Sequence, residues 1–419
     1  MSSTHLLVHH HAGLGGGDLG PAHITIGPDG SVDSVRPWAP PVPAEAGGPE
    51  LTAIPLLADS HLHLGISDGV HDDPDFHTID HIDGQLEQLA RFGIGLAHSL
   101  GTDQPWLTET LVERRAADPL GRAVGHSAGV GFGAVDGWPP ELTRPRLRYR
   151  PTEPEQARGY VRDLAAQGCT TVKIWTDSFG GTVPKTLTAI ARAIIAEAHD
   201  HGITTFAHVK DHADAESLVE LEVDVLAHSI RDRPISDRLL DSMAVHGTTL
   251  VPTLSREEAE FAFSTLHNPY LEDDSFRRAA GPRGVERLRH ERLSVDPAHP
   301  ARSLEIALEN VRRTHTHGID VGLGTDSGFR FKLLGFAQHR ELELLTRAGL
   351  STSAALGAGL AVNRRLLGAE QTGIDSTGPA SFFIVEGDPW KDIRATQSIE
   401  EVWISGRRIV AHSPESSHR

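Results

Sequence analysis

Short apolar runs alternate with helical patterns from about residue 54 to about residue 368, and this alternation constrains the fold more than any other feature. The stretches between most of the runs repeat apolar residues at helical spacing. The runs are 54–58, 94–98, 122–126, 171–175, 204–208, 223–228, 249–252 and 321–324. Strands separated by helices pair in parallel, because a parallel pair requires a crossover connection. Eight such strands predict an α/β fold with a (β/α)8 barrel of the TIM type.

The two ends of the chain have a different pattern, with short strand-like segments and turns. We expect strands at 5–10, 22–26 and 31–35 near the start, and at 381–386, 401–404 and 408–411 near the end. These strands would pair as a small β-sandwich made of residues 1–53 and 369–419, beside a barrel domain of residues 54–368. The long polar segment 255–300 predicts extra helices or a lid over the barrel mouth.

Composition excludes several classes of partner. A net charge of −18, from 39 basic and 57 acidic residues, argues against binding to nucleic acid or to an anionic membrane surface. The single cysteine, Cys169, excludes an intrachain disulfide framework and a cysteine-based zinc site. No signal peptide or membrane-spanning segment is recognisable. We therefore expect a cytoplasmic protein that acts on a small-molecule substrate. The composition is compatible with a homo-oligomer.

The first apolar run leads into the sequence LLADSHLHLG, which contains His61 and His63. Residues i and i+2 of a strand point to the same side, so the two imidazoles would lie side by side at the strand end. Two neighbouring imidazoles can bind one metal ion. The alternative is a pair of polar residues that hydrogen-bond to nearby loops.

Other predicted strands also end in, or contain, residues that can bind a metal. Lys173 interrupts an apolar strand, His208 and His228 end the next two, and Asp326 follows the eighth. In a barrel of this type, the active site lies at the carboxyl ends of the strands. We therefore expect four histidines, one lysine and one aspartate on one rim.

These residues, in this order, resemble the amidohydrolase superfamily, and the resemblance covers most of the chain. The segment GPASFFIVEGDPW, residues 378–390, is similar to a C-terminal segment of that family. The segment LVPTL, residues 250–254, looks like the seventh-strand segment of its imidazolonepropionase- and prolidase-like branch. His61 and His63, with one residue between them, are the strongest match.

The resemblance implies two divalent metal ions held by His61, His63, Lys173, His208, His228 and Asp326. His61, His63 and Asp326 would bind the more buried ion, the other two histidines would bind the second ion, and the lysine would bridge them. Nitrogen and oxygen ligands without sulfur favour Zn²⁺, with Mn²⁺, Fe²⁺ or Co²⁺ as alternatives.

Lys173 can act as a bridging ligand only after modification, because a free ammonium has three donors and no acceptor. Family members carboxylate the lysine Nζ with CO₂, which gives a carbamate (N6-carboxylated lysine). The alternative for Lys173 is an ordinary salt bridge to Asp177 or Asp326.

A binuclear site of this kind suits hydrolysis, because two ions about 3.5–4 Å apart can hold a hydroxide between them and polarise a carbonyl. Asp326 would be the catalytic residue that takes the proton and delivers it to the leaving group. We predict an amidohydrolase that cleaves a C–N bond in an amide, peptide or cyclic amide. A deaminase, a lactone or ester hydrolase on the same site, and a catalytically silent barrel scaffold are alternatives.

Substrate-binding residues are expected on the loops at the rim. His126, at the end of the third strand, could hydrogen-bond a substrate carbonyl, and Trp175 could narrow the pocket. Basic rim residues could bind a substrate carboxylate; they include Lys210, Arg231, Arg256, Arg330 and Lys332. Among these, Lys210, Arg231 and Arg256 are the predicted substrate-binding cations.

Overall fold

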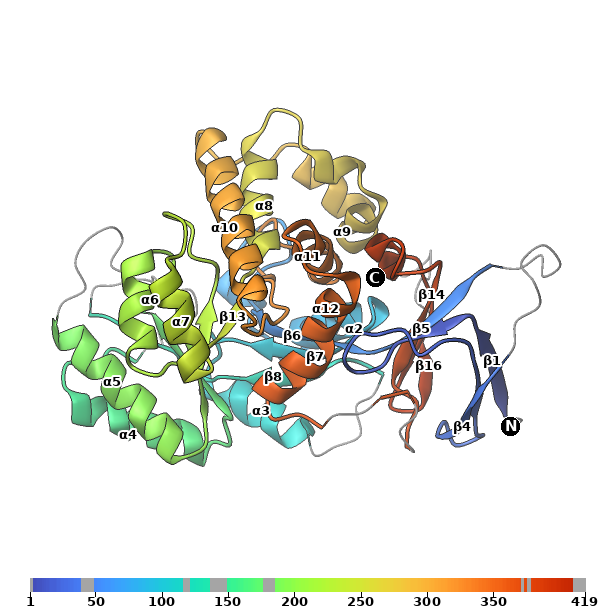
Figure 1. The fold of residues 1–419 in the computed structure, drawn as a ribbon, viewed down its shortest axis with the longest axis horizontal. Helices are drawn as coiled ribbons and strands as arrows, with labels where there is room; N and C mark the ends of the chain where they lie inside the picture. The colour runs from blue at the N-terminus through green and yellow to red at the C-terminus, as the bar shows by residue number, and fades with distance from the viewer. Residues whose placement is uncertain are drawn as a thin grey trace.

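The computed structural model describes residues 3–38, 49–115, 121–135, 149–175, 185–370, 373–374 and 378–409. Within these residues, helices pack around parallel strands on one side of the molecule, and mainly antiparallel strands gather on the other (Figure 1). The prediction of an α/β fold with parallel sheets is therefore confirmed.

The parallel strands belong to two sheets. One sheet has the order β13 (Thr249–Val251), β12 (Val225–Ala227), β11 (Thr204–His208), β10 (Thr171–Trp175) and β9 (Phe132–Gly133). The other has the order β6 (Leu57–Leu62), β7 (Ile94–Ser99) and β8 (Val124–Ser127). All residues of β6 and β10 are buried, which explains why both faces of these strands carry apolar residues.

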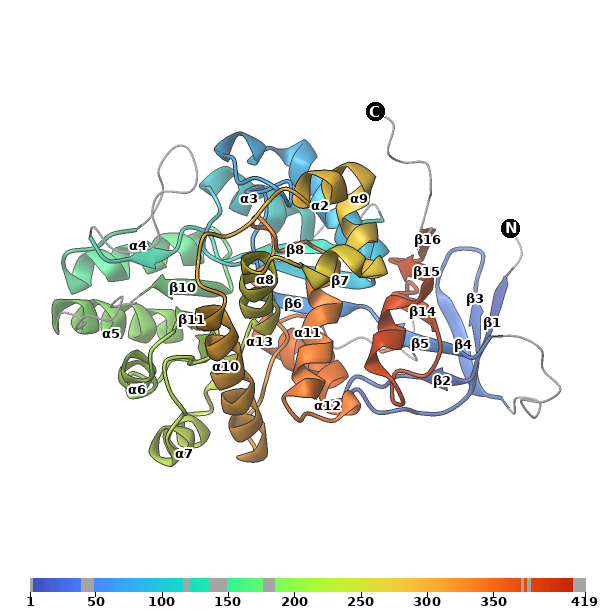
Figure 2. The same ribbon diagram turned by 90° about the horizontal axis from the view of Figure 1, so that it is seen from above.

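Helices connect these strands and cover the sheets (Figure 2). They are α2 (Ile79–Arg91), α3 (Pro105–Arg115), α4 (Pro154–Ala166), α5 (Lys185–Asp200), α6 (His212–Val219), α7 (Asp237–His246), α11 (Phe336–Arg347), α12 (Thr352–Gly357) and α13 (Asn363–Leu366). Short helical turns are η1 (Pro74–Phe76), η3 (Ala358–Val362) and η4 (Ile393–Gln397). In α2, Thr78 caps the first turn, and Ile82, Leu86 and Leu89 form the buried face. Among the described residues, no helix combines the length and the apolar composition that crossing a membrane requires.

The predicted strand 54–58 is wrong, because the structure divides this run between two sheets. Strand β5 (Leu51–Pro55) pairs antiparallel with β14 (Phe382–Glu386), far along the chain. The partner then changes: the Leu56 N–H donates to Ser381 and the Leu57 N–H donates to Gly93. The strand that carries His61 therefore begins at Leu57.

The predicted eighth strand at 321–324 occupies the expected place but is not a regular strand. It forms one isolated parallel bridge, Val321 with Leu250, and a second bridge joins Ser327, just beyond it, to Leu62. A close approach explains the glycine in this segment: a Cβ atom on Gly324 would lie 2.3 Å from the Val251 side chain. This segment still lies between β13 and β6 and brings Asp326 to the carboxyl end of β6.

The terminal segments of the chain form two further sheets. One contains β1 (Thr4–Val8), β3 (Ala22–Ile26) and β4 (Val32–Pro37), and the other contains β2 (His10–His11), β5, β14, β15 (Ile399–Ile404) and β16 (Arg407–Ile409). Side chains from both sheets, including Ile24, Ile26, Phe382 and Trp403, share one apolar cluster. The C-terminal strands thus pack against the N-terminal ones through buried apolar surface.

The polar segment 255–300 contains helices, as expected. They are α8 (Leu254–Ser264), η2 (Pro269–Glu272) and α9 (Asp274–Leu288), followed by α10 (Ala298–Thr316). The Phe263 ring of α8 stacks on Phe331 at 4.1 Å between centroids, and Phe276 and Phe336 extend this cluster. This packing holds α8 against the loop that follows Asp326.

Candidate active site

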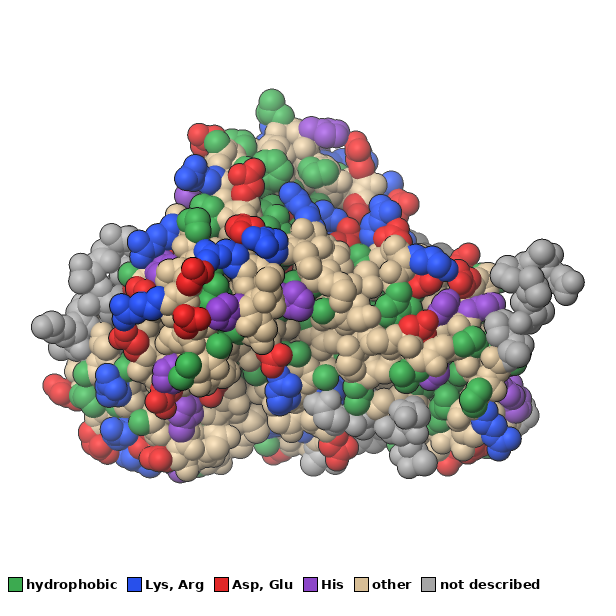
Figure 3. All heavy atoms as spheres, viewed as in Figure 1, with side chains coloured by type: hydrophobic (Ala, Val, Ile, Leu, Met, Phe, Trp, Pro, Cys, Tyr) green, Lys and Arg blue, Asp and Glu red, His purple; other side chains and the backbone are tan. Residues whose placement is uncertain are grey.

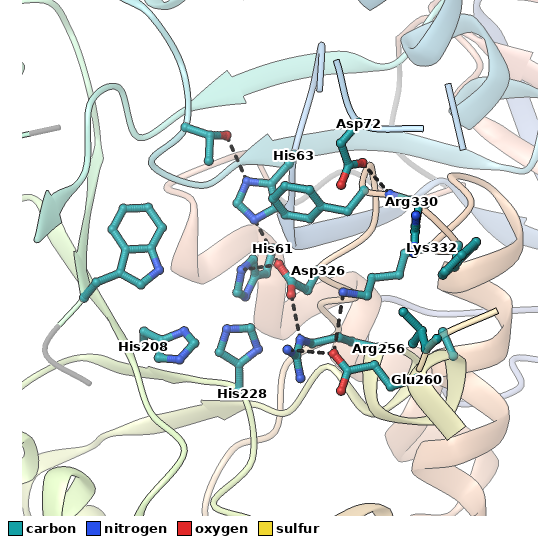
Figure 4. A pocket seen from close by; sticks show the side chains of 16 residues that line it. His61, His63, Asp72, His208, His228, Arg256, Glu260, Asp326, Arg330 and Lys332 are labelled. Atoms are coloured by element: carbon teal, nitrogen blue, oxygen red, sulfur yellow. Dashed lines mark hydrogen bonds and ion pairs between the residues drawn. The ribbon is translucent and has the colours of Figure 1, made fainter. Parts of the chain in front are cut away.

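A cavity of about 320 Å³ lies beside the carboxyl ends of β6, β11 and β12 (Figure 4). Five of the six predicted ligands line it, namely His61, His63, His208, His228 and Asp326. The sixth, Lys173, is completely buried, with its Nζ 5.4 Å from the centre of the Trp175 ring, which lines the cavity. The structure therefore brings these residues together from separate strand ends.

The four imidazoles form a continuous group around Asp326. The ring centroids of His61 and His228 are 4.7 Å apart, and those of His208 and His228 are 4.5 Å apart. Asp326 Oδ1 lies 2.9 Å from His63 Nε2 and 3.3 Å from His61 Nε2. Ligand atoms of His61, His228 and Asp326 lie within 4.8 Å of one another, so one metal ion could reach all three.

Two threonines orient the imidazoles. His63 Nδ1 forms a hydrogen bond of 2.9 Å with Thr102 Oγ1, and His228 Nδ1 forms one of 2.7 Å with Thr253 Oγ1. A hydrogen bond to one ring nitrogen fixes the ring and leaves the other nitrogen for a metal. Neither threonine was predicted as a site residue: Thr102 lies in a loop that carries no motif, and the LVPTL segment that contains Thr253 indicated only the family resemblance.

Three site residues have a left-handed backbone. The φ angles are 76° at His228, 52° at Thr253 and 52° at Asp326. This region is unfavourable for residues other than glycine, and it persists where surrounding contacts fix the chain. At Asp326 those contacts include hydrogen bonds from the Thr325 and Asp326 N–H groups to the His61 carbonyl. The strained turns direct the site side chains into the cavity.

A buried polar network lies behind His61 and Asp326. Asp59 Oδ1 accepts from the His61 N–H at 2.8 Å, and Asp59 Oδ2 accepts from Thr325 Oγ1 at 2.6 Å and from Gln338 Nε2 at 2.7 Å. Gln338 Nε2 is also 3.0 Å from Ser327 Oγ. Burial raises the pKa of Asp59 to about 7, although these hydrogen bonds oppose the increase. The network ties the residues that flank Asp326 to the end of β6.

The protonation states suit metal ligands. Burial lowers the pKa of His61 and of His228 well below the usual range, so both imidazoles are neutral at neutral pH. Burial by itself raises the pKa of Asp326, but hydrogen bonds from His61 and His63 outweigh it and hold this pKa well below its usual range. Neutral imidazoles and an ionised carboxylate are the forms that bind cations.

Lys173 and His61 each carry a buried polar atom without a hydrogen-bond partner among the described residues, Nζ and Nδ1 respectively. Burial lowers the pKa of Lys173 to about 7. Asp177, one proposed salt-bridge partner of Lys173, lies outside the described residues, and Asp326 makes no hydrogen bond to Nζ. Unpaired polar atoms at this depth are costly unless another group satisfies them, so the donor set fits a metal centre.

The predicted substrate-binding residues divide into two groups. Trp175 and Arg256 line the cavity, whereas His126, Lys210 and Arg231 do not. Arg231 instead pairs through Nε with Glu257 Oε1 at 3.1 Å and donates to the backbone carbonyls of residues 209 and 229. His126 is buried, and Lys210 is half-buried.

Arg256 is bound by acidic neighbours. Its Nε lies 3.1 Å from Asp326 Oδ2, its Nη2 lies 2.9 Å from Glu260 Oε1, and its Nη1 contacts Glu257. Further lining residues that the site prediction omitted include Asp72, Glu260 and Phe329. The sequence carried a signal only for Phe329, which begins the charged and aromatic FRFK segment that follows Asp326.

Comparisons with known proteins identify the family and support the fold. The amidohydrolase family model matches residues 52–409 of this chain. No curated protein matches the chain. Among solved structures, the chain is similar to an Xaa-Pro dipeptidase with bound methionine, with 17% identity and a TM-score of 0.71 over 98% of this chain and 100% of that chain. A prolidase complexed with N-methylphosphonate-L-proline has 18% identity and a TM-score of 0.70 over 98% and 100% of the two chains.

A. niger ochratoxinase is a third similar structure, with 16% identity and a TM-score of 0.67 over 97% of this chain and 95% of that chain. At these identities, the structural likenesses establish the fold, and the family match establishes the relationship. The match includes all six predicted ligands, both parallel sheets and the terminal strands β14, β15 and β16, with all but the first residue of β5. The chain therefore belongs to the amidohydrolase family and is a metal-dependent hydrolase that acts on carbon–nitrogen bonds.

Proposed function

We propose that this protein is a binuclear metal hydrolase that cleaves the amide bond of a dipeptide or an N-acyl amino acid. The observation that carries the proposal is the convergence of four buried imidazoles and Asp326 on one cavity, with Lys173 buried beside them. The names of the similar prolidase and Xaa-Pro dipeptidase support the choice of dipeptides.

The proposed ligands are those predicted from the sequence: His61, His63, Lys173, His208, His228 and Asp326. The neutral imidazoles, the ionised carboxylate and the absence of sulfur from this set support Zn²⁺, with Mn²⁺, Fe²⁺ or Co²⁺ as alternatives. When bound, the ions would activate a water molecule and polarise the scissile carbonyl.

Lys173 is proposed to carry a carbamate. Burial lowers its pKa to about 7, so a substantial fraction is the neutral amine at neutral pH. The amine attacks CO₂, forms an N–C bond and releases one proton, which gives two oxygens that share one negative charge, where the ammonium offered only donors. This change also supplies an explanation for a buried Nζ without a hydrogen-bond partner.

Asp326 is proposed as the proton carrier. It would accept a proton from the attacking water and deliver it to the leaving nitrogen, as general base and then general acid. Arg256 Nε, 3.1 Å from Asp326 Oδ2, would hold the carboxylate in position. The guanidinium has little freedom to move, because it also pairs with Glu260. The Trp175 and Phe329 rings would form an apolar wall that limits access of bulk water.

The architecture proposed for this site is one closed barrel. The bridges from β13 to Val321 and from β6 to Ser327 support it, since they link the edge strands of the two parallel sheets. The terminal strands are proposed to form a β-sandwich, a view supported by their shared apolar cluster. The pairing of β5 with β14 moves the proposed boundary between the two parts to about residue 56.

Metal analysis and mass spectrometry test the centre. We expect about two divalent ions per chain and a mass increase of one CO₂ on Lys173. One ion without the CO₂ adduct would favour the deaminase alternative, and no ion after gentle purification would favour the scaffold alternative.

A substrate panel tests the reaction. The metal-loaded protein should release free amine from glycyl-L-proline or N-acetyl-L-phenylalanine, and a chelator should abolish this release until metal is restored. Release of ammonia from amidines or aminopurines, with no cleavage of the amides, would contradict the proposal.

A further inference from the structure

Lys332 is a cation that the cavity lining leaves without a hydrogen bond to its ammonium group. Its side chain is only 15% exposed, and its nearest carboxylate oxygen, Glu260 Oε1, is 4.0 Å from Nζ, beyond hydrogen-bond distance. Figure 4 shows the side chain extending toward Glu260 and Asp326. A turn fixes the residue, because its N–H donates to Phe329 and its carbonyl accepts from Gly328. The position of its backbone therefore does not depend on the Nζ contact.

The other two basic residues that line the cavity, Arg256 and Arg330, already contact neighbouring side chains. Arg256 pairs with three carboxylates, those of Asp326, Glu257 and Glu260. The Arg330 guanidinium lies 4.3 Å from the centre of the Phe331 ring, and Nη1 is 3.9 Å from Glu291, which does not line the cavity. Lys332 is therefore the lining cation best placed to meet an incoming anion.

We propose that Lys332 binds a substrate carboxylate and makes the enzyme selective for amides that carry one. This inference rests on the proposed function and identifies the substrate class of that site. A carboxylate at Nζ would replace a long contact with a charge-assisted hydrogen bond. The Phe329 ring, 5.8 Å from Nζ, would exclude water from one side of the contact and so strengthen it.

The position of Lys332 also assigns the carboxylate to one half of the substrate. Glu260 Oε1 is shared by Lys332 and Arg256, and Arg256 in turn contacts Asp326. Lys332 thus lies on the side of the cavity where Asp326 would protonate the leaving nitrogen. The carboxylate therefore belongs to the leaving amine, as in a dipeptide or an N-acyl-α-amino acid, and not to the acyl half.

The test compares acids with matched neutral compounds. N-acetyl-L-phenylalanine and glycyl-L-proline are assayed beside their C-terminal carboxamides, and succinanilic acid carries its carboxylate on the acyl side. In Lys332→Met, we expect KM for the two α-carboxylates to rise about 10- to 100-fold with little change in kcat. The carboxamides and succinanilic acid should change less than about threefold.

Two further variants serve as controls. Lys332→Arg should restore most of the affinity for the acids, because it restores the positive charge. Arg330→Met removes an equal charge from the same cavity and should leave the ratio of acid to carboxamide KM unchanged. A loss of acid selectivity in Arg330→Met equal to that in Lys332→Met would overturn the assignment to Lys332.

The outcomes separate the assignment from the proposed function. Equal losses for acids and carboxamides, or no loss, overturn the role of Lys332 and leave amide hydrolysis intact. A loss confined to succinanilic acid overturns the assignment to the leaving amine. If the wild-type enzyme cleaves none of the amides, the proposed function fails. The role of Lys332 is then tested by calorimetry, which measures the binding of N-acetyl-L-phenylalanine and of its carboxamide to the wild type and to Lys332→Met. A preference for the acid that Lys332→Met removes supports the assignment, and any other result overturns it.

Discussion

Lys173 shows how one residue can be unfavourable for the fold and necessary for the site. Its Nζ is buried and has no hydrogen-bond partner among the described residues, and the side chain lies inside β10 between Val172 and Ile174. An isolated amine at such a position destabilises the folded state unless a ligand or a modification satisfies it. Stability and function are therefore opposed at this residue.

We expect Lys173→Met to raise the thermal stability of the metal-free protein, because the buried amine is replaced by an apolar chain of similar length. The same variant should bind less metal and lose at least about 100-fold in kcat/KM. Lys210→Met, at a half-buried lysine outside the cavity lining, is the control and should change neither property. A metal-free Lys173→Met protein that melts below the wild type would contradict the argument.

At the scale of elements, helix α11 supports the site from behind. Gln338, in its first turn, bonds through Nε2 to Asp59 and also accepts from the Gly335 N–H through Oε1. Glu341, one turn later, accepts the N–H groups of Leu254 and Ser255 at the start of α8. One helix thus positions both the turn that carries Asp326 and the helix that carries Arg256.

Gln338→Leu should destabilise the protein by about 1–3 kcal/mol, because Asp59 loses a donor in a buried network. It should also lower metal affinity, since the turn at Asp326 loses part of its support. Urea unfolding and metal titration measure the two effects. Gln156→Leu, at an exposed glutamine of α4, is the matched control. Equal stability of Gln338→Leu and the control would show that the network contributes little.

At the scale of the whole molecule, acidic and basic side chains are interspersed on the surface, as Figure 3 shows for one face. Many are paired, such as Arg340 with Glu258 at 2.6 Å and Arg162 with Glu155 at 2.9 Å. The net charge of −18 therefore did not indicate which basic residues remain available at the cavity.

His339 lies where α11 meets the terminal sheet, and it should make stability depend on pH. Burial lowers its pKa to about 4, while an unfolded histidine titrates near 6.5. Its contribution is complete above pH 6.5 and is lost as the pH falls toward 4, because only the unfolded state then binds the proton. The loss from this residue is roughly 3 kcal/mol at most.

Urea unfolding of His339→Gln and wild type between pH 7 and 4.5 measures this effect. The variant should be less stable at pH 7, since it loses the hydrogen bonds to Phe92 and Thr396, but its stability should fall less steeply with acid. Buried His98 titrates in the same range and provides the pH dependence common to both proteins. Parallel curves for the two proteins would exclude His339 as a source of the pH dependence.

The sequence alone determined the parallel α/β fold, the family and the group of residues at the strand ends. Apolar periodicity and the spacing of His61 and His63 are local properties, and parallel strands place their carboxyl ends together whatever the detailed packing. Lys173, His208, His228 and Asp326 were found in the same way.

Only the tertiary structure decided which sheet the segment Leu51–Pro55 joins and which basic side chains line the cavity. The first depends on β14, more than 300 residues away, and the second on which acidic side chain reaches each cation. Arg231 is held by Glu257 and Arg256 by Asp326, whereas the carboxylate nearest to Lys332 among the described residues, that of Glu260, lies 4.0 Å from Nζ. Such pairings depend on long-range distances that no local pattern encodes, because charge interactions between loops follow from where the packed core places them.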